Sequence, residues 1–430
     1  MVQLHHLPDT LGPDPERILM RPFHIATEPR EGSEGISRAR RVVHGVRDMG
    51  ADAAAVELER VCREFSHRHP DIVSHFRHRW REMDGALDLD DAGFSPQQRD
   101  LIGAYFSHEY SYASAALMNP SVVLHPDQGG AGEGGARFVM SLRTVGEGHI
   151  SAVAFREGTF HADGAMSLDP LPDVSFSPVI DARDVGGADE VVDLEFDHDT
   201  PLSGTVIFPV TPMQRNGLED LRLVRFDDPE VGEPVYYGSY TAYSGRAIRS
   251  ELLETRDFLD FRMRPMTGSA AVNKGMAIFP RRVGGKYAVI GRQDSESLFY
   301  ITSDTMTHWD GGARIAVPRY PWELIQIGNC GAPIEIDEGW LLLTHGVGAV
   351  RKYAIGAMLL DRDDPSKVLA RSRHPILAPE DERREGYVPN VVYTCGGLAA
   401  GRKLFLPHGV ADQSVAFCWL DLDELMTDME

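Results

Sequence analysis

The chain has 430 residues, of which 42% are hydrophobic and 25% charged, close to the composition of an ordinary soluble globular protein. Its net charge of −22, from 43 Lys and Arg against 65 Asp and Glu, disfavours nucleic acids and anionic membranes as partners. No apolar run reaches the roughly 18 residues that a membrane-spanning helix needs, and the first residues lack the pattern of a signal peptide. We therefore expect a cytoplasmic protein without a membrane partner.

The cysteines indicate neither a disulfide framework nor a zinc site, because they lie far apart and lack CxxC spacing. They are Cys62, Cys330, Cys395 and Cys418. We expect them to be buried free thiols. No pattern in the sequence points to a bound metal or an organic cofactor, so none is expected.

Residues 1–110 are predicted to form an N-terminal arm followed by helices. The irregular Pro, Gly and Arg residues in 1–50 predict an arm with little secondary structure. Apolar positions recur at helical spacing between residues 51 and 83, with a break at Pro70. Another helix is predicted to begin at Ser95, as the N-cap. The amphipathic pattern favours packing against the rest of the chain or a second copy, which would give a homo-oligomer.

From residue 111 onward the chain changes to short β runs between turns rich in Gly, Pro and Asp. Several of these runs resemble one another, and two continue identically as His-Gly-Val, at residues 345–347 and 408–410. The last three recur at intervals of roughly 50 to 65 residues, which is typical of propeller blades. The prediction is an all-β fold: a five-bladed β-propeller over residues 111–430, with an N-terminal helical extension and an elaborated insertion near 155–205.

Two adjacent carboxylates, Glu219 and Asp220, stand between a turn signal and a strand-like run that includes Arg222. Neighbouring side chains of a strand point to opposite faces, so one carboxylate is expected to face a pocket while the other braces Arg222 or the backbone. A carboxylic acid at a strand end is what acid-catalysed cleavage of a glycosidic bond requires. The alternative is a solvated turn followed by an edge strand.

Further polar blocks are flanked by glycine, as expected where the backbone closely approaches a ligand. Each block alone is also explained by turn residues or a surface ion pair. In a propeller, however, inner strand ends converge on a central funnel, so scattered polar residues can form one site. The candidate residues in these blocks are Asn119, Ser121, Arg143, Lys274, Arg292, Asp294, Glu296, His345, Tyr387 and Asn390.

The order of these blocks resembles glycoside hydrolase family 130, over roughly residues 112–425. The motifs that carry the resemblance are Asn-Pro-Ser, strand-Arg, Gly-Leu-Glu-Asp-Leu-Arg, Asn-Lys-Gly-x-x-x-Phe-Pro, Gly-Arg-Gln-Asp, His-Gly-Val and Val-Pro-Asn-Val. The family comprises β-mannoside phosphorylases and β-1,2-mannosidases on a five-bladed β-propeller. The resemblance implies an inverting enzyme in which Asp220 is the general acid and acts through a sugar hydroxyl.

The resemblance also assigns roles to the other candidates. It implies that Lys274, Arg292 and His345 hold the attacking phosphate, or surround the attacking water in a hydrolase. The residues expected to bind the substrate, by resemblance or by position beside the acid, are Asn119, Ser121, Arg143, Glu219, Arg222, Tyr387 and Asn390.

Three departures from the phosphorylase pattern resemble the hydrolytic branch of the family. Leu221 replaces a proline, Gly275 replaces a polar amide, and Tyr387 replaces an aspartate. An inverting hydrolase needs a second carboxylate as base, roughly 6.5–9.5 Å from the acid. Asp294 and Glu296 are the candidates, since strand alternation would turn both toward the funnel.

The leading sequence-based hypothesis is therefore an inverting glycosidase that cleaves small β-mannosides, β-1,2-linked by resemblance, with Asp220 as acid and Glu296 or Asp294 as base. The alternative is a phosphorylase that uses inorganic phosphate and releases mannose 1-phosphate. A third hypothesis, from another class, is a propeller that binds glycans without cleaving them.

Overall fold

The structure is a computed structural model that describes residues 2–29, 35–89, 93–183, 190–229, 232–380 and 384–430. The chain divides into two compact units. One consists of residues 1–15 and 112–430, and the other of residues 16–111.

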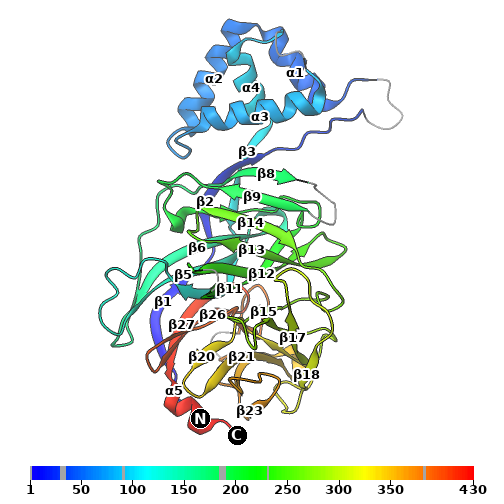
Figure 1. The fold of residues 1–430 in the computed structure, drawn as a ribbon. Helices are drawn as coiled ribbons and strands as arrows, with labels where there is room; N and C mark the ends of the chain where they lie inside the picture. The colour runs from blue at the N-terminus through cyan, green and yellow to red at the C-terminus, as the bar shows by residue number, and fades with distance from the viewer. Residues whose placement is uncertain (1, 30–34, 90–92, 184–189, 230–231, 381–383) are drawn as a thin grey trace. The chain divides into compact units, whose positions relative to one another are not determined.

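Residues 16–111 form a largely helical unit (Figure 1). Its helices are α1 (Arg38–Met49), α2 (Ala51–Phe65), α3 (Ile72–Leu87) and α4 (Pro96–Tyr105). The predicted break at Pro70 falls between α2 and α3. Ser95 accepts a hydrogen bond from the Gln98 amide nitrogen, and the Gln98 side chain accepts one from the Ser95 amide, which is a capping box. The predicted break and helix start are confirmed.

These helices pack around an apolar cluster that includes Val43, Leu58, Phe76 and Trp80. Helix α4 comes very close to α3 at Gly103, where a Cβ would lie 1.9 Å from the carbonyl oxygen of Phe76. Any larger residue at this position would push the two helices apart, so the glycine sets their spacing.

The prediction of little secondary structure in residues 1–50 is wrong. This segment contains β1 (His5–Leu11), β2 (Asp14–Pro22) and α1. Strand β1 pairs antiparallel with β27 (Ser414–Asp421), and the rings of His5 and Trp419 stack at 3.9 Å. Strand β2 pairs with β3 (Ser107–Ala113). Because their partners, β27 and β3, lie far along the chain, no local sequence pattern indicates these strands.

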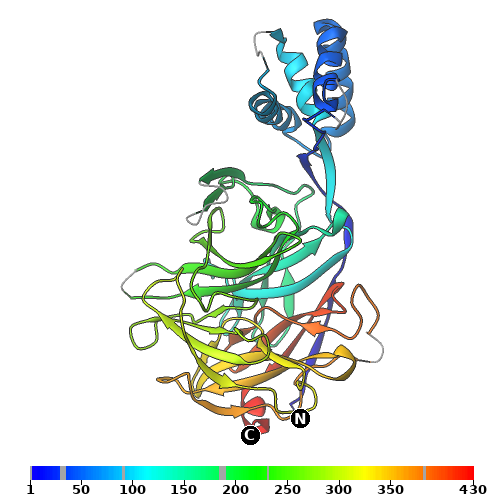
Figure 2. The ribbon, with the colours of Figure 1, turned by 90° about the vertical axis from the view of Figure 1, so that its right-hand side faces the viewer.

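The other unit consists of antiparallel sheets that follow one another along the chain (Figures 1 and 2). The first and largest sheet has the order β4-β5-β6-β11-β12-β13-β14-β9-β8, with β7 and β10 also pairing with β6. Its strands are β4 (Ala116–Leu124), β5 (Ala136–Val145), β6 (Ser151–Phe160), β7 (Met166–Leu168), β8 (Val179–Arg183), β9 (Val191–Glu195), β10 (Val206–Ile207), β11 (Gly217–Phe226), β12 (Val235–Tyr243), β13 (Ile248–Thr255) and β14 (Asp260–Pro265). Strands β7 to β9 lie in the region expected to be an insertion.

Three smaller sheets complete this unit, in the orders β15-β16-β17-β18, β19-β21-β22-β23 and β24-β26-β27-β1. Strand β20 pairs with β21, and β25 with β26. The bounds are β15 (Ala277–Ile278), β16 (Tyr287–Gly291), β17 (Leu298–Ser303), β18 (Ala313–Ala316), β19 (Gln326–Asn329), β20 (Ile334–Ile336), β21 (Gly339–Val347), β22 (Tyr353–Leu360), β23 (Val368–Arg371), β24 (Val392–Tyr393), β25 (Leu398–Ala400) and β26 (Lys403–Val410), followed by helix α5 (Leu422–Asp428). A mostly β fold is thus confirmed, whereas five blades stay a prediction.

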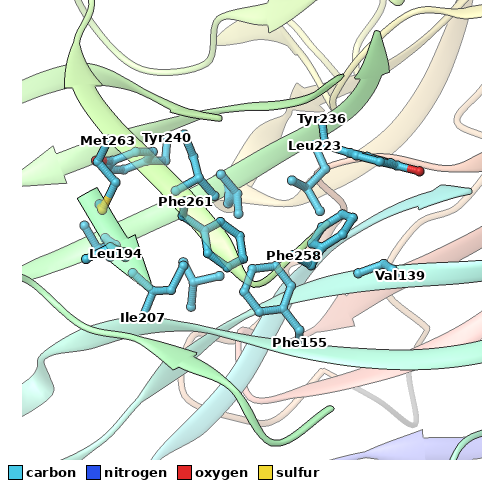
Figure 3. Packing of buried hydrophobic residues seen from close by; sticks show 14 of the residues in the cluster. Val139, Phe155, Leu194, Ile207, Leu223, Tyr236, Tyr240, Phe258, Phe261 and Met263 are labelled. Atoms are coloured by element: carbon cyan, nitrogen blue, oxygen red, sulfur yellow. The ribbon is translucent and has the colours of Figure 1, made fainter. Parts of the chain in front are cut away.

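An apolar cluster that includes several aromatic residues packs between the strands of the first sheet (Figure 3). Phe155 contacts Phe258 and Phe261, with ring centroids 5.9 and 5.7 Å apart. Leu221 and Leu223 of β11 belong to the same cluster. This cluster holds β11 firmly, and β11 carries the two carboxylates singled out above.

Candidate active site

Two β-bulges lie side by side at the beginning of β4 and β11. The pairing of β4 with β5 shifts register between Met118 and Ser121, and that of β11 with β12 shifts between Glu219 and Arg222. The bulged residues Asn119 and Asp220 both have positive φ, 51° and 55°. Bulges of this kind re-aim side chains and are frequent beside active sites. Here they bring the Asn119 amide within 2.6 Å of Asp220 Oδ1, to which it donates a hydrogen bond.

The expectation that Glu219 and Asp220 point to opposite faces is wrong. Arg143 of β5 donates to both, through Nη1 to Asp220 Oδ1 at 3.0 Å and through Nη2 to Glu219 Oε1 at 2.8 Å. Strand alternation fails because the bulge inserts an extra residue at this point of β11. One guanidinium therefore holds both carboxylates on the same side.

Asp220 is largely buried, and three cationic side chains surround it. Burial alone would raise the pKa of its carboxyl group, but Arg143, Arg222 and Lys274 outweigh burial and lower the pKa to about 2. Without a bound ligand, Asp220 is therefore ionised at neutral pH. A role as proton donor needs something that offsets the charge of these cations.

Lys274 forms an ion pair with the second carboxylate. Its Nζ lies 2.5 Å from Glu219 Oε2, so Glu219 bridges Lys274 and Arg143. The preceding residue, Asn273, has positive φ and donates a hydrogen bond to the Ser295 hydroxyl. That bond ties the Lys274 segment to the turn between β16 and β17.

Arg222 is a buried residue that connects the strands around Asp220. Its side chain is buried and donates to Asn329 Oδ1 at 3.2 Å, to the Asp220 carbonyl oxygen at 2.8 Å and to the Tyr393 hydroxyl at 2.6 Å. These bonds link β11, β19 and β24. The geometry suits a residue that positions the Asp220 backbone, and direct substrate binding by Arg222 stays a prediction.

Arg292 and His345 form a pair at the ends of β16 and β21. Arg292 Nη1 lies 3.3 Å from His345 Nε2, and His345 Nδ1 lies 3.2 Å from the Asn329 carbonyl oxygen. Because that oxygen only accepts, Nδ1 carries the hydrogen and Nε2 accepts from Arg292. Burial, followed by the charges of Arg292 and Arg222, lowers the pKa of His345 well below its usual value, so the ring is neutral.

Arg292 is a cation without a carboxylate partner among the residues that the structure describes. Gly328 makes room for the pair, since a Cβ at this position would lie 2.3 Å from the His345 ring and 3.2 Å from Arg292. A partly exposed guanidinium beside a neutral imidazole is an arrangement that can receive an anion.

The remaining predicted substrate-binding residues are placed differently. Ser121 is fully buried, and its hydroxyl accepts a hydrogen bond from the Leu223 amide at 2.9 Å, so it joins β4 to β11. Asn390 precedes β24, has positive φ, and its carbonyl accepts from the Tyr353 amide. Tyr387 is 45% exposed. Contact of these three residues with a sugar stays a prediction.

Asp294 and Glu296 lie in the turn between β16 and β17, so the assumption that strand alternation orients them is wrong. Both are exposed. Asp294 Oδ1 accepts from the amides of Glu296 and Ser297, at 2.9 and 2.7 Å, and therefore stabilises the turn itself. The three residues after Arg292 turn the chain back, because Ser295 adopts positive φ.

Asp412 is a site residue that the sequence analysis missed. It lies in the turn between β26 and β27 with positive φ. Burial, followed by the charge of Asp220, raises its pKa to about 6, while Arg143 and Arg351 oppose the shift. Asp412 therefore lies near Asp220 and shares Arg143 with it as a neighbouring cation. It directly follows the second His-Gly-Val repeat and Ala411, and a comparison of the two repeats as equivalent hairpins would have drawn attention to it.

Asp412→Asn is expected to stabilise the protein at about pH 7.5 by about 2 kcal/mol, while lowering activity. A carboxyl group with a raised pKa contributes stability that is full below its unfolded value near 3.8 and is lost as the pH rises through about 6. Asparagine stays neutral, so the variant does not lose this stability as the pH rises. Thermal unfolding of the wild type and the variant between about pH 4 and 8 measures the difference in stability between them. A difference of the same size at both ends of this pH range would contradict the prediction.

Among the described residues, no group of three His, Cys, Asp or Glu side chains is placed to hold a metal ion. Nor does any helix in that part of the chain have the length and apolar character needed to cross a membrane. The four cysteines are free thiols, and all except Cys62 are buried.

Several known proteins are similar to this chain in sequence. A family model described as β-1,4-mannooligosaccharide phosphorylase, that of glycoside hydrolase family 130, matches residues 201–430. A 1,2-β-oligomannan phosphorylase from Thermoanaerobacter sp. (strain X514) is 32% identical over 220 residues, covering 50% of this chain and 72% of the relative. A β-1,2-mannobiose phosphorylase from Listeria innocua is 31% identical over 231 residues, covering 52% and 63%.

Solved structures share the fold. The complex of β-1,2-mannobiose phosphorylase from Listeria innocua with β-1,2-mannobiose has a TM-score of 0.54 at 20% identity, covering 74% of this chain and 92% of that one. A structure from the study of family 130 glycoside hydrolases that target β-1,2-mannosidic linkages in Candida mannan has a TM-score of 0.52 at 18% identity, covering 72% and 86%. Because the family model matches more than half of the residues, the chain belongs to glycoside hydrolase family 130.

Proposed function

We propose that this protein is a β-mannoside phosphorylase that cleaves small β-mannosides, β-1,2-linked, with inorganic phosphate and releases mannose 1-phosphate. The observation that carries the proposal is Arg292, which lies beside neutral His345 and has no carboxylate partner among the described residues. The sequence analysis favoured hydrolysis, whereas the curated relatives named above are phosphorylases, which supports the alternative.

In this mechanism phosphate attacks the anomeric carbon from the face opposite the leaving sugar, and the configuration inverts. Asp220 supplies a proton to the leaving oxygen through a sugar hydroxyl. Asn119 and Arg143 hold the Asp220 carboxylate beside the mannosyl unit, and Asp412, which lies near Asp220 and Arg143, would accept a hydrogen bond from a mannosyl hydroxyl. Lys274, Arg292 and His345 receive the phosphate.

The charge around Asp220 supports phosphate rather than water as the nucleophile. With a pKa of about 2, Asp220 is ionised and cannot donate a proton at neutral pH. A phosphate anion near Lys274 and Arg292 would offset the neighbouring positive charge and raise that pKa. A neutral water molecule would not. Phosphate binding would then both supply the nucleophile and prepare the acid.

We also propose that residues 111–430 form the catalytic domain as a five-bladed β-propeller. The blades would be β4–β6, β11–β14, β15–β18, β19–β23, and β24–β27 completed by β1. The sheet orders support this division, with β6 and β11 meeting through only one pair of residues, Ser151 and Gly217. A homo-oligomer formed through the helices and a cytoplasmic location stay predictions.

The proposed function is tested with β-1,2-mannobiose in the presence and absence of inorganic phosphate. We expect cleavage only with phosphate, and mannose 1-phosphate in an amount equal to the mannose released. Two molecules of mannose per disaccharide, at a rate independent of phosphate, would establish hydrolysis instead. Binding of the disaccharide without turnover under either condition would favour the non-catalytic glycan-binding protein.

A further inference from the structure

His149 and Tyr387 form a contact between two exposed segments that are far apart in the sequence. The Tyr387 hydroxyl lies 2.9 Å from His149 Nδ1, and the ring centroids are 6.0 Å apart. His149 belongs to the turn between β5 and β6, and Tyr387 to the segment before β24. The mechanism described above gives His149 no role, and it leaves open which sugar of the substrate Tyr387 would contact.

The Tyr387 segment is fastened to the turn that carries Asp412. The Val388 amide donates to the Ala411 carbonyl at 2.8 Å, and the Ala411 amide donates to Val391 at 2.8 Å. Gly386 packs so tightly on Ala411 that a Cβ there would lie 2.6 Å from the Ala411 methyl group. Tyr387 therefore lies beside the turn of Asp412, a residue that is close to Asp220 and Arg143.

The turn that carries His149 is equally well held. The Gly146 amide donates to the Ile150 carbonyl and the His149 amide to Gly146, both at 3.2 Å. It directly follows β5, the strand of Arg143. Both side chains of the pair thus project from backbone that is fixed relative to the acid, although the side chains themselves are exposed.

The chemistry of the pair suits a sugar ring. An exposed aromatic face stacks on the apolar C–H face of a sugar, while polar groups at its edge bind hydroxyls. The Tyr387 hydroxyl is engaged by His149, which fixes the orientation of the ring. Nε2 of His149 has no hydrogen-bond partner in the described part of the chain, so it is available to a sugar hydroxyl.

We propose that Tyr387 and His149 form a platform for the leaving-group sugar of the substrate, which is also the acceptor sugar in the reverse reaction. This inference rests on the proposed phosphorylase function. In the proposed mechanism the mannosyl unit lies beside Asp220. Tyr387 and His149 lie farther out, where they would contact the sugar on the other side of the cleaved bond. Tyr387 stacks on that sugar, and His149 holds Tyr387 in place.

The reverse reaction tests the platform, with mannose 1-phosphate as donor and mannose or β-1,2-mannobiose as acceptor. Tyr387→Ala is expected to raise the KM for acceptor about tenfold, which corresponds to about 1.4 kcal/mol. The KM for mannose 1-phosphate changes by less than about twofold. Tyr387→Phe keeps the ring and loses the bond to His149, so it and His149→Ala should each show a smaller rise, of about threefold.

Tyr105→Ala is a matched control, since Tyr105 is a similarly exposed tyrosine, at 42%, in helix α4. An unchanged acceptor KM in both Tyr387→Ala and His149→Ala, with either acceptor, would overturn the platform. Failure of the proposed function looks different: the wild-type enzyme would then make no disaccharide from mannose 1-phosphate. The KM values of the same variants for hydrolysis of β-1,2-mannobiose and β-1,2-mannotriose would still test the platform in that case.

Discussion

Asp220→Asn is expected to lower kcat for phosphorolysis of β-1,2-mannobiose by about 10²- to 10⁴-fold, with a much smaller change in KM. Asparagine keeps the shape of the side chain and its contacts with Asn119 and Arg143, but it has no proton to donate. Steady-state kinetics at saturating phosphate measure the loss. If the variant kept more than about a tenth of the wild-type kcat, Asp220 would not be the general acid.

Asp304→Asn serves as the matched control, because its carboxylate is exposed and forms a surface ion pair with Lys286. Glu296→Gln and Asp294→Asn distinguish phosphate from water as the nucleophile. Phosphorolysis needs no second carboxylate as base, so neither change should approach the loss caused by Asp220→Asn. A loss of similar size in Glu296→Gln would restore the hydrolytic mechanism with Glu296 as base.

Arg292→Gln is expected to raise the KM for phosphate by about 10- to 150-fold. This range corresponds to the free energy of losing one hydrogen bond to a charged group. The KM for the mannoside should change little, because Arg292 contacts the nucleophile rather than the sugar. Lys274→Met should act in the same direction. It also leaves Glu219 without one of its two cationic partners, so a fall in kcat should accompany it.

Arg314→Gln is the control for this charge change. Arg314 is an exposed arginine of β18, in the same sheet as β16, and lies near Asp294. Phosphate titrations at constant ionic strength separate a specific site from general screening. If Arg292→Gln and Arg314→Gln had the same small effect, Arg292 would have no part in binding phosphate.

Which parts of the site could be predicted depended on how local their signals were. Glu219 and Asp220 stood out because they are adjacent, and their order relative to Lys274, Arg292 and His345 identified the family. Their orientation could not be predicted, since a bulge depends on the register between β11 and β12 and not on residues 217–222 alone. The same holds for Asp294 and Glu296, where a turn replaces the expected strand.

The misses in the fold have a related cause. The helices of residues 51–105 follow from apolar spacing and a capping box, both of which act within a few residues. Strand β1 pairs with residues about 400 positions away, His5 with Trp419 and Leu11 with Val415, so its own residues carry little information about the pairing. Asp412 was missed because it joins the site through space, from a turn outside the polar blocks that carry the family resemblance.

The pairing of β1 with β27 also has a consequence for how the chain is made. A ribosome synthesises β1 roughly 400 residues before β27, the strand that completes its hydrogen bonds. Until β27 has emerged, β1 has no strand to pair with, and unpaired strands are prone to intermolecular pairing. The sheet that β1 completes can therefore close only after β27 has left the ribosome, and slower synthesis at low temperature lengthens the time that β1 spends unpaired.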